Sequence, residues 1–379
     1  MFKVAVGHSE DVESVAAVDE ILEQCAAQLD DRVPQAGVLF AAIAHDHKAV
    51  LERIMETYPE LALVGCTTDG EVSSVMGFKE DSLTLMLFDT DTVTITAGVG
   101  RGVRSDPEAA ACAAVGDARN GVTAAPRLCI ALPEGLGTDT AGFLRGLKGA
   151  LGPDVPVCGG MSGDQLRFER TYQFFGSEVL SDAIPVLLFS GQLQLSYAVA
   201  TGWNPIGARH RVTESRGNLV VSIDDKPASD LYTHYFEEHS VHYPLAVYLD
   251  GEEDFYLSTP AGFDGGTIIC QNTVPEGAYV QLAEASRDNI IAGASTSVGQ
   301  ALAQFPGDAP TAGLLFSCAG RRASLGTRTG EEYLQLNAVA GNTLPLCGFY
   351  TYGELCPMTG STETQSHNCG FVTVLLGAA

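Results

Sequence analysis

Three segments of the chain repeat one pattern, in which an apolar run meets a glycine and is closed soon afterwards by a second glycine and an acid. LALVGCTTDGEV (61–72) and LPLCGFYTYGEL (344–355) close on Gly-Glu, and VPVCGGMSGD (155–164) closes on Gly-Asp one residue sooner. A glycine after a buried strand allows a positive φ or the close approach of another backbone, so we expect the same tight path each time. We expect Glu71 and Asp164 to accept backbone N–H groups and to fix these turns.

An aliphatic or β-branched run lies upstream of each first glycine. The gaps are 27, 31 and 34 residues, counted from Val38, Leu128 and Leu314 to Gly65, Gly159 and Gly348. Each gap holds a helix-like segment, such as HKAVLERIMETY (47–58) in the first. This spacing is typical of a β-α-β unit.

Two longer stretches, 82–100 and 185–203, alternate apolar and polar residues over two strand lengths, so we expect an antiparallel hairpin in each. The sequence therefore predicts a mixed α/β (α+β) fold of duplicated β-α-β and hairpin units, with packed mixed sheets and outer helices. A stretch rich in Gly, Pro and charge, GWNPIGARHRVTESRGN (202–218), predicts a boundary between two domains, 1–222 and 223–379.

Charge and length limit the function classes. The 379 residues include 47 acids and 21 bases, for a formal net charge of -26, and 45% are hydrophobic, which is typical of a globular protein. An acidic chain without a basic stripe repels phosphate backbones, so we expect no nucleic-acid partner. We find neither a bilayer-length apolar run nor a signal-peptide pattern, so we expect a cytoplasmic protein without membrane contact.

Ten cysteines are scattered along the chain without a CxxC pair. In a cytosolic protein they are expected to be reduced, and several lie in apolar runs where cysteine is a small buried hydrophobe. Cys347, Cys356, His367 and Cys369 have the ligand types of a zinc site, which we keep as an alternative although their spacing is not paired.

Five ordered motifs resemble the FIST family, with its N-terminal region (about 35 to 222) followed by its C-terminal region (about 223 to 360). They are TGWNPIG with NLVVSIDDKPASDLY, HYPLAVYL, VPEGAYVQL, GLLFSCAGRR, and CGFYTYGEL with SHN after it. The resemblance implies an intracellular sensory module that binds a small ligand. Similarity to a stand-alone bacterial subset implies a haem protein that senses nitric oxide and controls a partner histidine kinase.

The haem version would use the segment YTHYFEEHSVHYPLAVYL (232–249), because haem iron needs an imidazole or thiolate and the macrocycle needs apolar surroundings. The candidate cofactor-binding residues are His234, His239, His242 and Tyr243, with His242 as the metal ligand beside the motif that the resemblance implies is near the family's haem ligand. The candidate supporting residues are Glu237 or Glu238 for the imidazole and Arg209, Arg211 and Arg216 for a propionate. For any single histidine, a solvated or hydrogen-bonded role without metal is the competing interpretation.

A second group of residues predicts a pocket in the C-terminal region. Arg321 follows Cys318 at the end of an apolar run, and such a cation either lowers a thiol pKa or holds a carboxylate. The other members combine polar groups with apolar bodies and are suited to lining a pocket. The candidate ligand-binding residues are Cys318, Arg321, Tyr352, Glu354, His367 and Asn368. In the competing interpretation, Cys318 is a packed thiol at a strand end.

These features predict a sensor and not an enzyme. GxSxG, HExxH, P-loop and GxGxxG signatures are missing from the required contexts, so we assign no catalytic residue. A thiol site of Cys318, His367 and Glu354 is the enzymatic alternative. The leading prediction is a haem-based nitric-oxide sensor that modulates a histidine kinase. The alternatives are a sensor for a small carboxylate or amino acid, and a ligand-free protein-protein adaptor, with a homodimer left open.

Overall fold

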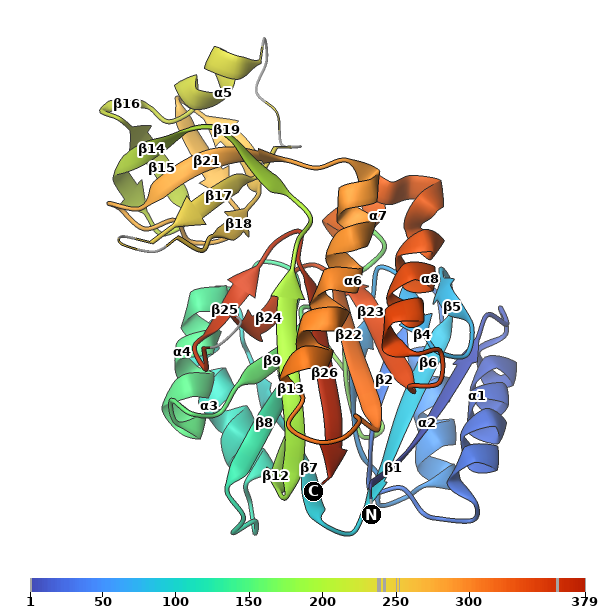
Figure 1. Cartoon of the computed structure of the whole chain (residues 1–379). Coiled ribbons are helices and arrows are strands. Elements are labelled where there is room, and N and C mark those ends of the chain that lie inside the picture. Colours follow the sequence, from blue (N-terminus) through green and yellow to red (C-terminus); the bar gives the residue numbers. More distant parts are fainter. Residues whose placement is uncertain are drawn as a thin grey trace.

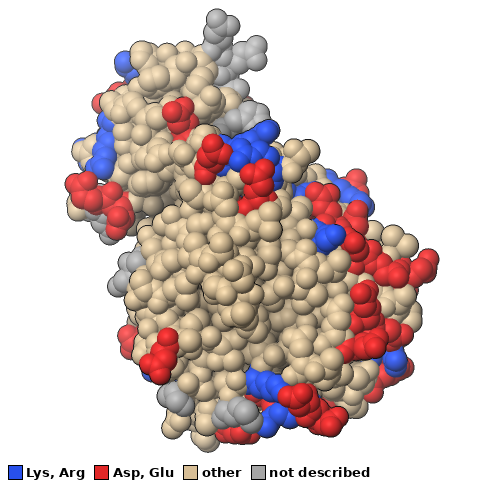
Figure 2. Space-filling model, turned by 45° about the vertical axis from the view of Figure 1, so that its right-hand side comes forward, with Lys and Arg blue, Asp and Glu red and all other residues tan. Residues whose placement is uncertain are grey.

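The structure is a computed structural model and describes residues 2–236, 240, 243–249, 251, 253–358 and 361–378. It has two bodies (Figure 1): a large one, here called the prism (2–200 and 287–378), and a smaller one, the inserted domain (204–284). No helix among these described ranges is long and apolar enough to cross a bilayer. Figure 2 shows acidic side chains spread over both bodies and a wide uncharged area on the large one.

The prism repeats one unit three times. In each unit an opening strand and a helix precede two parallel strands, which are joined through one or more helices; a short hairpin and a return strand follow. The first unit comprises β1 (Phe2–Ser9), α1 (Ser14–Leu29), β2 (Ala36–Ala41), α2 (His47–Thr57), β3 (Ala62–Thr67), β4 (Glu71–Ser73), β5 (Gly77–Lys79) and β6 (Leu83–Thr90). The second comprises β7 (Val93–Arg101), α3 (Pro107–Ala118), β8 (Pro126–Ala131), α4 (Thr140–Leu151), β9 (Val157–Gly160), β10 (Gln173–Phe175), β11 (Glu178–Leu180) and β12 (Ala183–Gly191). The third comprises β13 (Leu193–Ala200), α6 (Arg287–Gln304), β22 (Ala312–Cys318), α7 (Ala319–Leu325), α8 (Thr329–Ala340), β23 (Leu346–Thr351), β24 (Glu354–Pro357), β25 (Thr364–His367) and β26 (Phe371–Ala378).

Each sheet of the prism is completed by a hairpin from another unit. The strand orders are β1-β6-β2-β3-β10-β11, β7-β12-β8-β9-β24-β25 and β13-β26-β22-β23-β4-β5. The pairs β2/β3, β8/β9 and β22/β23 are parallel, which confirms the predicted β-α-β units. Because each hairpin crosses to another sheet, no unit can complete its sheet alone.

The inner faces of the three sheets share one hydrophobic core. Phe40 of the first sheet lies 4.6 Å from Phe349 and 6.4 Å from Phe316 of the third, measured between ring centroids. Ile130 and Phe189 of the second sheet belong to the same core. The outer faces are covered by α1 with α2, α3 with α4, and α6 with α8 (Figure 1), so the predicted outer helices are confirmed.

The stretches 82–100 and 185–203 are not hairpins, which corrects the prediction for them. β6 lies between β1 and β2, whereas β7 pairs with β12 in the next sheet. β13 likewise leaves β12 and pairs with β26. Alternating side chains indicate strands, but they do not identify the partners that each strand finds. Hairpins occur instead at β4/β5, β10/β11 and β24/β25.

The inserted domain interrupts the third unit between β13 and α6. Its curved sheet has the order β18-β17-β21-β14-β15-β20-β19, with β16 on β15, around a separate core that includes Val212, Tyr232 and Val280. Its elements are β14 (Asn204–Arg216), β15 (Leu219–Ile223), β16 (Lys226–Pro227), α5 (Asp230–Tyr235), β17 (Leu245–Tyr248), β18 (Tyr256–Ser258), β19 (Pro260–Asp264), β20 (Thr267–Cys270) and β21 (Tyr279–Glu284). The domain boundary expected after residue 222 falls inside β15. Residues before and after this boundary contribute strands to the same sheets of the prism.

The first glycine of each repeated segment lies where two strands are too close for a side chain. A Cβ on Gly65, Gly159 or Gly348 would lie 2.1, 2.0 or 1.9 Å from the backbone oxygen of the residue opposite on the neighbouring parallel strand. The expected close backbone approach is therefore confirmed at the same position of all three units.

We expect Gly348→Ala to lower the free energy of unfolding by about 2–3 kcal/mol, because the added methyl group forces the β22 and β23 backbones apart. Gly149→Ala in α4 is the matched control, since a Cβ there would meet nothing within 4 Å. It should be neutral or stabilising by roughly 0.5–1 kcal/mol. Urea unfolding curves measure both variants. Equal stability of the two would contradict the crowding at Gly348.

Candidate functional site at the junction of the two bodies

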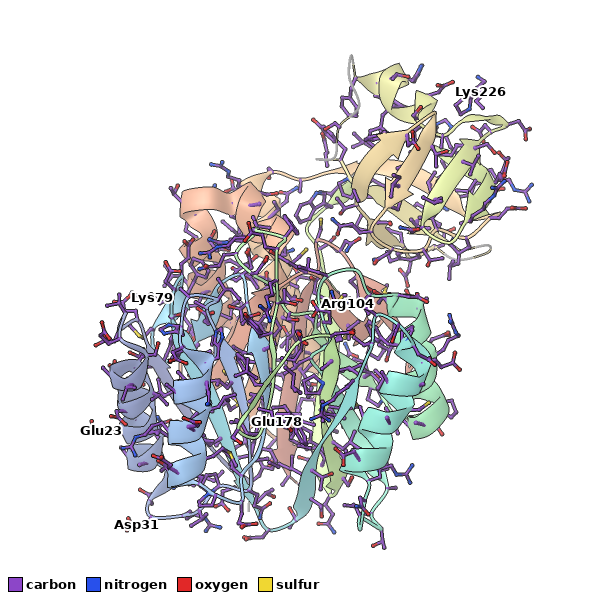
Figure 3. The ribbon with its side chains drawn as sticks, turned by 180° about the vertical axis from the view of Figure 1, so that it is seen from behind. Glu23, Asp31, Lys79, Arg104, Glu178 and Lys226 are labelled. Carbon is purple, nitrogen blue, oxygen red and sulfur yellow. The ribbon has the colours of Figure 1, made fainter. Side chains whose placement is uncertain are left out.

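A cleft lies between the inserted domain and the end of the prism where its parallel strands finish. It contains a cavity of about 560 Å³, here called the junction cavity, and a neighbouring cavity of about 510 Å³ that shares Thr138, Gln271 and Asn272 with it. Figure 3 shows Arg104 at this end of the prism and Lys226 at the far end of the inserted domain. The carboxyl ends of parallel strands are a common position for ligand sites in open α/β sheets.

Among the described residues, no charged side chain lines the junction cavity. Its apolar lining includes Met161, Leu166, Phe168 and Ile269. Its hydroxyl and amide groups include those of Thr138, Thr140, Asn218, Thr259, Gln271, Asn272, Ser366 and Asn368. The cavity therefore offers hydrogen-bond donors and acceptors from both bodies without a fixed charge.

The segment 366–369 joins the prism to the inserted domain at the cavity wall. The Thr259 N–H donates to Asn368 Oδ1 at 3.2 Å, and Asn368 Nδ2 donates to Gln271 Oε1 at 3.3 Å. Asn272 Nδ2 donates to the Ser366 carbonyl at 3.0 Å. The same amides that line the cavity thus hold the two bodies together, so a ligand that competes for them would alter the junction.

Tyr352 lies on the cavity wall, and a loop of the second unit fixes it. Its hydroxyl donates to Asp164 and accepts the Leu166 N–H at 2.8 Å, and its ring stacks on Phe168 with centroids 5.0 Å apart. Asp164 also accepts the N–H groups of residues 168–170 at 2.7–2.9 Å, which confirms its turn-fixing role. Phe168 is 62% exposed, so an aromatic face is available at the cavity entrance.

The acids of the three repeated segments are not equivalent, although the sequence pattern groups them. Glu71 and Glu354 begin the exchanged strands β4 and β24, whereas the residue that begins β10 is Gln173. Asp164 lies in the longer loop before Gln173. In the second unit the sequence pattern therefore selected Asp164, whereas the residue that corresponds to Glu71 and Glu354 is Gln173.

Glu71 and Glu354 are fully buried and do not line the cavity. Glu71 accepts hydrogen bonds from the Thr68 hydroxyl and from the Ser82 hydroxyl (2.5 Å) and N–H (3.3 Å), so the expected backbone contact is present. Glu354 accepts the Gly370 N–H at 2.9 Å, and its other oxygen has no hydrogen-bond partner. Burial raises the pKa of Glu71 to about 7 and that of Glu354 well above its usual value.

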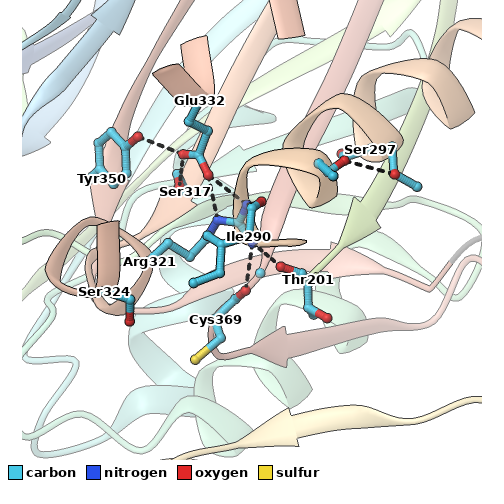
Figure 4. Close-up of polar contacts among 12 residues, drawn as sticks. Thr201, Ile290, Ser297, Ser317, Arg321, Ser324, Glu332, Tyr350 and Cys369 are labelled. Atoms are coloured by element: carbon cyan, nitrogen blue, oxygen red, sulfur yellow. Dashed lines mark hydrogen bonds and ion pairs between the residues drawn. The ribbon is translucent and has the colours of Figure 1, made fainter. Parts of the chain in front are cut away.

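Arg321 also lies away from the cavity, with 0% of its surface exposed. Its guanidinium donates to Glu332 Oε1 at 3.0 and 2.7 Å, to the Ile290 carbonyl at 2.6 Å, to the Cys369 carbonyl at 3.1 Å and to the Thr201 carbonyl (Figure 4). These contacts tie α7 to α8, to α6 and to the segment before β26. The Arg321 guanidinium, which was predicted to hold a ligand carboxylate, is therefore already hydrogen-bonded to groups of the protein itself.

Cys318 lies on the cavity wall beside Cys369, which the sequence suggested only as a zinc ligand. A Cβ on Gly320 would lie 3.5 Å from Cys318 Sγ and 3.9 Å from Cys369 Sγ, so the two sulfurs meet there. The Thr259 hydroxyl lies 3.6 Å from Cys369 Sγ. Hydrogen bonding between the thiols, ahead of burial, raises the pKa of Cys318 and lowers that of Cys369. Cys369, and not Cys318, is the more acidic thiol.

Of the remaining predicted ligand-binding residues, Asn368 lines the cavity and His367 does not. His367 Nε2 is hydrogen-bonded to the Cys356 carbonyl at 2.9 Å, and burial lowers the pKa of His367 to about 4. Cys347 and Cys356 pack in the central core, away from Cys369. No three His, Cys, Asp or Glu residues of the described part of the chain are grouped to hold a metal ion, so the zinc alternative is wrong.

Most of the predicted haem segment lies outside the described residues, including His239, His242, Glu237 and Glu238. The described helix α5 ends at Tyr235, with His234 exposed on it. Tyr243 stacks on Phe236, with ring centroids 4.3 Å apart, and its carbonyl accepts the Tyr232 hydroxyl at 2.6 Å. These contacts give Tyr243 a packing role in the inserted domain.

A third cavity, of about 540 Å³, lies on the inserted domain and is lined by His234 and by His210, which sequence analysis missed. His210 Nδ1 is hydrogen-bonded to Asp224 Oδ2 at 2.7 Å, and His210 Nε2 is buried without a partner. The flanking Arg209 stacks over the Tyr248 ring at 3.7 Å, and Arg216 pairs with Glu214 at 2.8 Å. A carboxylate-oriented imidazole is the arrangement that metal-binding histidines use.

The family comparisons match nearly the whole chain. The model for the FIST N domain matches residues 35–226, and the model for the FIST C domain matches residues 228–357. The chain belongs to the FIST family. FIST domains are associated with signal-transduction sensing. The junction between the two models falls within the inserted domain, so the FIST N and FIST C segments both contribute to the prism and to the inserted domain.

This FIST chain is also similar to an uncharacterized protein, MJ1623, of Methanocaldococcus jannaschii, with 26% identity over 149 residues. That match covers 34% of the chain and only 29% of the relative. Among solved structures, the FIST chain matches a cyanuric acid hydrolase from A. caulinodans at a TM-score of 0.40 and 10% identity, over 100% of this chain and 99% of that one. A second cyanuric acid hydrolase matches at a TM-score of 0.39 and 8% identity, over 100% of both chains.

Glu71→Gln tests the buried acid of the FIST prism, and Gln173 shows that glutamine fits the corresponding position. The pKa of Glu71 is raised from 4.5 to about 7 on folding, so its stabilising contribution is complete below about pH 4.5 and is lost as the pH rises through 7. We expect wild type to lose about 2.5 kcal/mol from this group between pH 5 and pH 8, and the variant to lose none of it.

The measurement is urea unfolding of both proteins at the two pH values, and the difference between them removes the effect of other titrating groups. Glu52→Gln on the exposed face of α2 should retain the wild-type pH dependence. An unchanged pH dependence in Glu71→Gln would contradict the raised pKa.

Proposed function

We propose that this FIST protein is a signal-transduction sensor whose ligand is a small, uncharged, polar molecule bound in the junction cavity. The observation that supports this is a wall built from both bodies, with amide and hydroxyl groups but no charged side chain among the described residues. A ligand that binds both sides favours one relative arrangement of the bodies, and that difference in affinity is what a sensor requires.

A carboxylate or amino-acid ligand has less support than a neutral one. Arg321, its expected partner, is buried and already paired with Glu332. The net charge of -26 also lowers the local concentration of anions. An uncharged amide or heterocycle can instead use Asn272, Gln271 and Asn368 for hydrogen bonds and the faces of Phe168 and Tyr352 for stacking.

We propose binding without turnover and a signalling protein, such as a histidine kinase, as the partner. The support for the partner is the association of FIST domains with signal-transduction sensing. Against a thiol-enzyme site, His367 is bonded to a backbone carbonyl and Glu354 is buried with a raised pKa. Glu354 lies close enough to interact with the Cys318 thiol, but its raised pKa disfavours the carboxylate that a base requires.

We expect a thermal-shift screen to find stabilisers among neutral amides and heterocycles (nicotinamide, benzamide, uracil) and none among succinate, glutamate and arginine. Gln271→Ala should weaken binding of the best stabiliser about tenfold in calorimetric titration, because one amide pair is lost. Gln304→Ala at the end of α6 is the matched control and should bind like wild type. A carboxylate stabiliser, or equal affinities in both variants, would contradict the proposed ligand class or its site. No stabiliser at all would favour the ligand-free adaptor.

Haem binding on the inserted domain, for sensing nitric oxide, is the second candidate function. His210 favours it, because its Nδ1 is oriented by Asp224 and its Nε2 has no partner. His210 would supply a ligand to the iron and Lys226 would pair with a propionate, but Asp224 and Asp230 put charge on the wall that the macrocycle needs to be apolar. The described residues thus fit the iron better than the porphyrin, and the proposal also relies on His239 and His242.

Haemin titration followed by the Soret band tests this candidate. We expect saturable binding by wild type and its loss in His242→Ala, while His47→Ala, in the prism, should bind as wild type does. Loss in His210→Ala instead would place the haem in the described cavity. A wild-type protein without a saturable band would contradict haem binding but leave the junction-cavity proposal intact.

A further inference from the structure

Two cysteines meet on the wall of the junction cavity. Cys318 is the last residue of β22, and Cys369 precedes the neighbouring strand β26. They come together because the Cys318 N–H donates to the Gly370 carbonyl at 3.0 Å, which aligns the end of one strand with the start of the other. Gly320 leaves room for both sulfurs, which a Cβ there would approach to 3.5 and 3.9 Å.

The backbone at Cys369 is held in an unusual conformation. Its φ is 56°, in the left-handed region that side-chain-bearing residues rarely adopt. Such strain persists only where the surroundings enforce it, and it concentrates at functional positions. Here two contacts hold the backbone. Arg321 donates to the Cys369 carbonyl, and the neighbouring Asn368 accepts the N–H of Thr259 in the inserted domain. Figure 4 shows the Cys369 sulfur directed away from Arg321.

Two neighbours stabilise a sulfur anion at this position. The Thr259 hydroxyl lies 3.6 Å from Cys369 Sγ, and the Cys318 thiol is also within hydrogen-bonding reach of it. The hydrogen bond from Cys318 lowers the pKa of Cys369, with support from Thr259 and Arg321, and this outweighs the opposing effects of burial and of Glu354. Cys318 stays protonated, since the same contact raises its pKa. The pair therefore has one thiol suited to attack and a second suited to follow it.

We propose that Cys369 and Cys318 form a peroxide-reactive dithiol in which Cys369 attacks and Cys318 resolves. The Cys369 thiolate attacks one oxygen of a hydroperoxide and breaks the O–O bond, and the released alkoxide or hydroxide takes up a proton. The products are Cys369 sulfenic acid and an alcohol or water. The Cys318 sulfur then attacks the Cys369 sulfur, its proton leaves with the hydroxide as water, and a disulfide forms. Sulfur is oxidised and the peroxide is reduced.

The junction cavity suits such a substrate. Hydrogen peroxide and small organic hydroperoxides are uncharged, and no charged side chain lines this cavity among the described residues. Oxidation also has a structural consequence. Cys369 and Asn368 hold Thr259 of the inserted domain, so a bond from Cys369 to Cys318 changes the contact that joins the two bodies. This proposal shares a cavity with the ligand proposal but does not depend on that ligand.

Cys112 provides an internal control, because it is exposed whereas Cys318 and Cys369 are buried. Wild type is treated with limiting hydrogen peroxide, and each thiol is mapped by mass spectrometry after alkylation. We expect a Cys318–Cys369 disulfide to form about ten times faster than Cys112 is oxidised, although both paired cysteines are over 90% buried. If Cys112 reacts first and Cys369 stays reduced, exposure alone sets reactivity and the proposal is overturned.

The variants separate the two roles. In Cys318→Ser, Cys369 should accumulate as a sulfenic acid that dimedone traps. In Cys369→Ser, Cys318 should remain reduced.

Thr259→Val should slow the reaction several-fold, whereas Thr138→Val, on the same wall but without a sulfur contact, should not. Oxidation of Cys318 at the wild-type rate in Cys369→Ser would overturn the assignment. Should a cysteine variant fail to fold, the comparison with Cys112 in wild type still decides.

Failure here and failure of the ligand proposal are distinguishable. Peroxide mapping uses no ligand, and the thermal-shift screen is run on fully reduced protein. A protein that binds an amide but forms no disulfide keeps the first proposal alone, and the converse result keeps the second alone.

Discussion

Backbone hydrogen bonds between exchanged hairpins and parallel strands hold the prism closed. β4 pairs with β23, β10 with β3 and β24 with β9, so the sheet of every unit ends on a strand from another unit. Within each unit the two parallel strands also approach closely, and a glycine lies at that point. Since all three sheets then enclose one core, the ends of their parallel strands meet at one end of the prism. The position of the junction cavity follows from this closure.

The buried pair Arg321 and Glu332 organises the third unit around that cavity. Both side chains are 0% exposed, and an ion pair removed from water persists only when its remaining donors and acceptors are used. Ser317 and Tyr350 donate to the second Glu332 oxygen at 3.1 and 2.6 Å, and backbone carbonyls take the remaining Arg321 donors. A cation that looks available in the sequence is therefore a fixed support for the Cys369 backbone. Arg321 therefore affects the cavity by positioning the backbone of its wall, and not by presenting a charge to a ligand.

The sequence supports the local parts of this description. Alternating and apolar runs predict the strands, their spacing predicts the β-α-β units, and the glycines predict close approaches, because each depends on neighbours in the chain. Strand partners depend on residues far apart, so two stretches that alternate like hairpins were assigned wrongly. Gln173 escaped notice for the same reason: its equivalence to Glu71 is visible only in the register of the exchanged strands.

The candidate site shows the same division. Tyr352, Cys318 and Asn368 were found because polar groups beside strand ends tend to line pockets. Cys369 and His210 were not predicted as candidates for these sites, because their distinguishing features are a strained φ in one and an unpartnered nitrogen in the other. Neither feature leaves a pattern in the sequence.

Among the described residues, no charged side chain lines the junction cavity, although the protein has a net charge of -26. Acidic side chains spread over both bodies repel anions. Salt screens this repulsion, so it acts within about one Debye length of the surface. A cavity with its own arginine could overcome that repulsion for a carboxylate, but Arg321 is turned inward and fully paired. The molecules that reach the wall without an electrostatic cost are neutral ones, and amides, heterocycles and hydroperoxides all belong to that group. If the two proposals hold, charge restricts the class of ligand first, and the amides and the two sulfurs on the wall determine which neutral molecule binds and which one reacts.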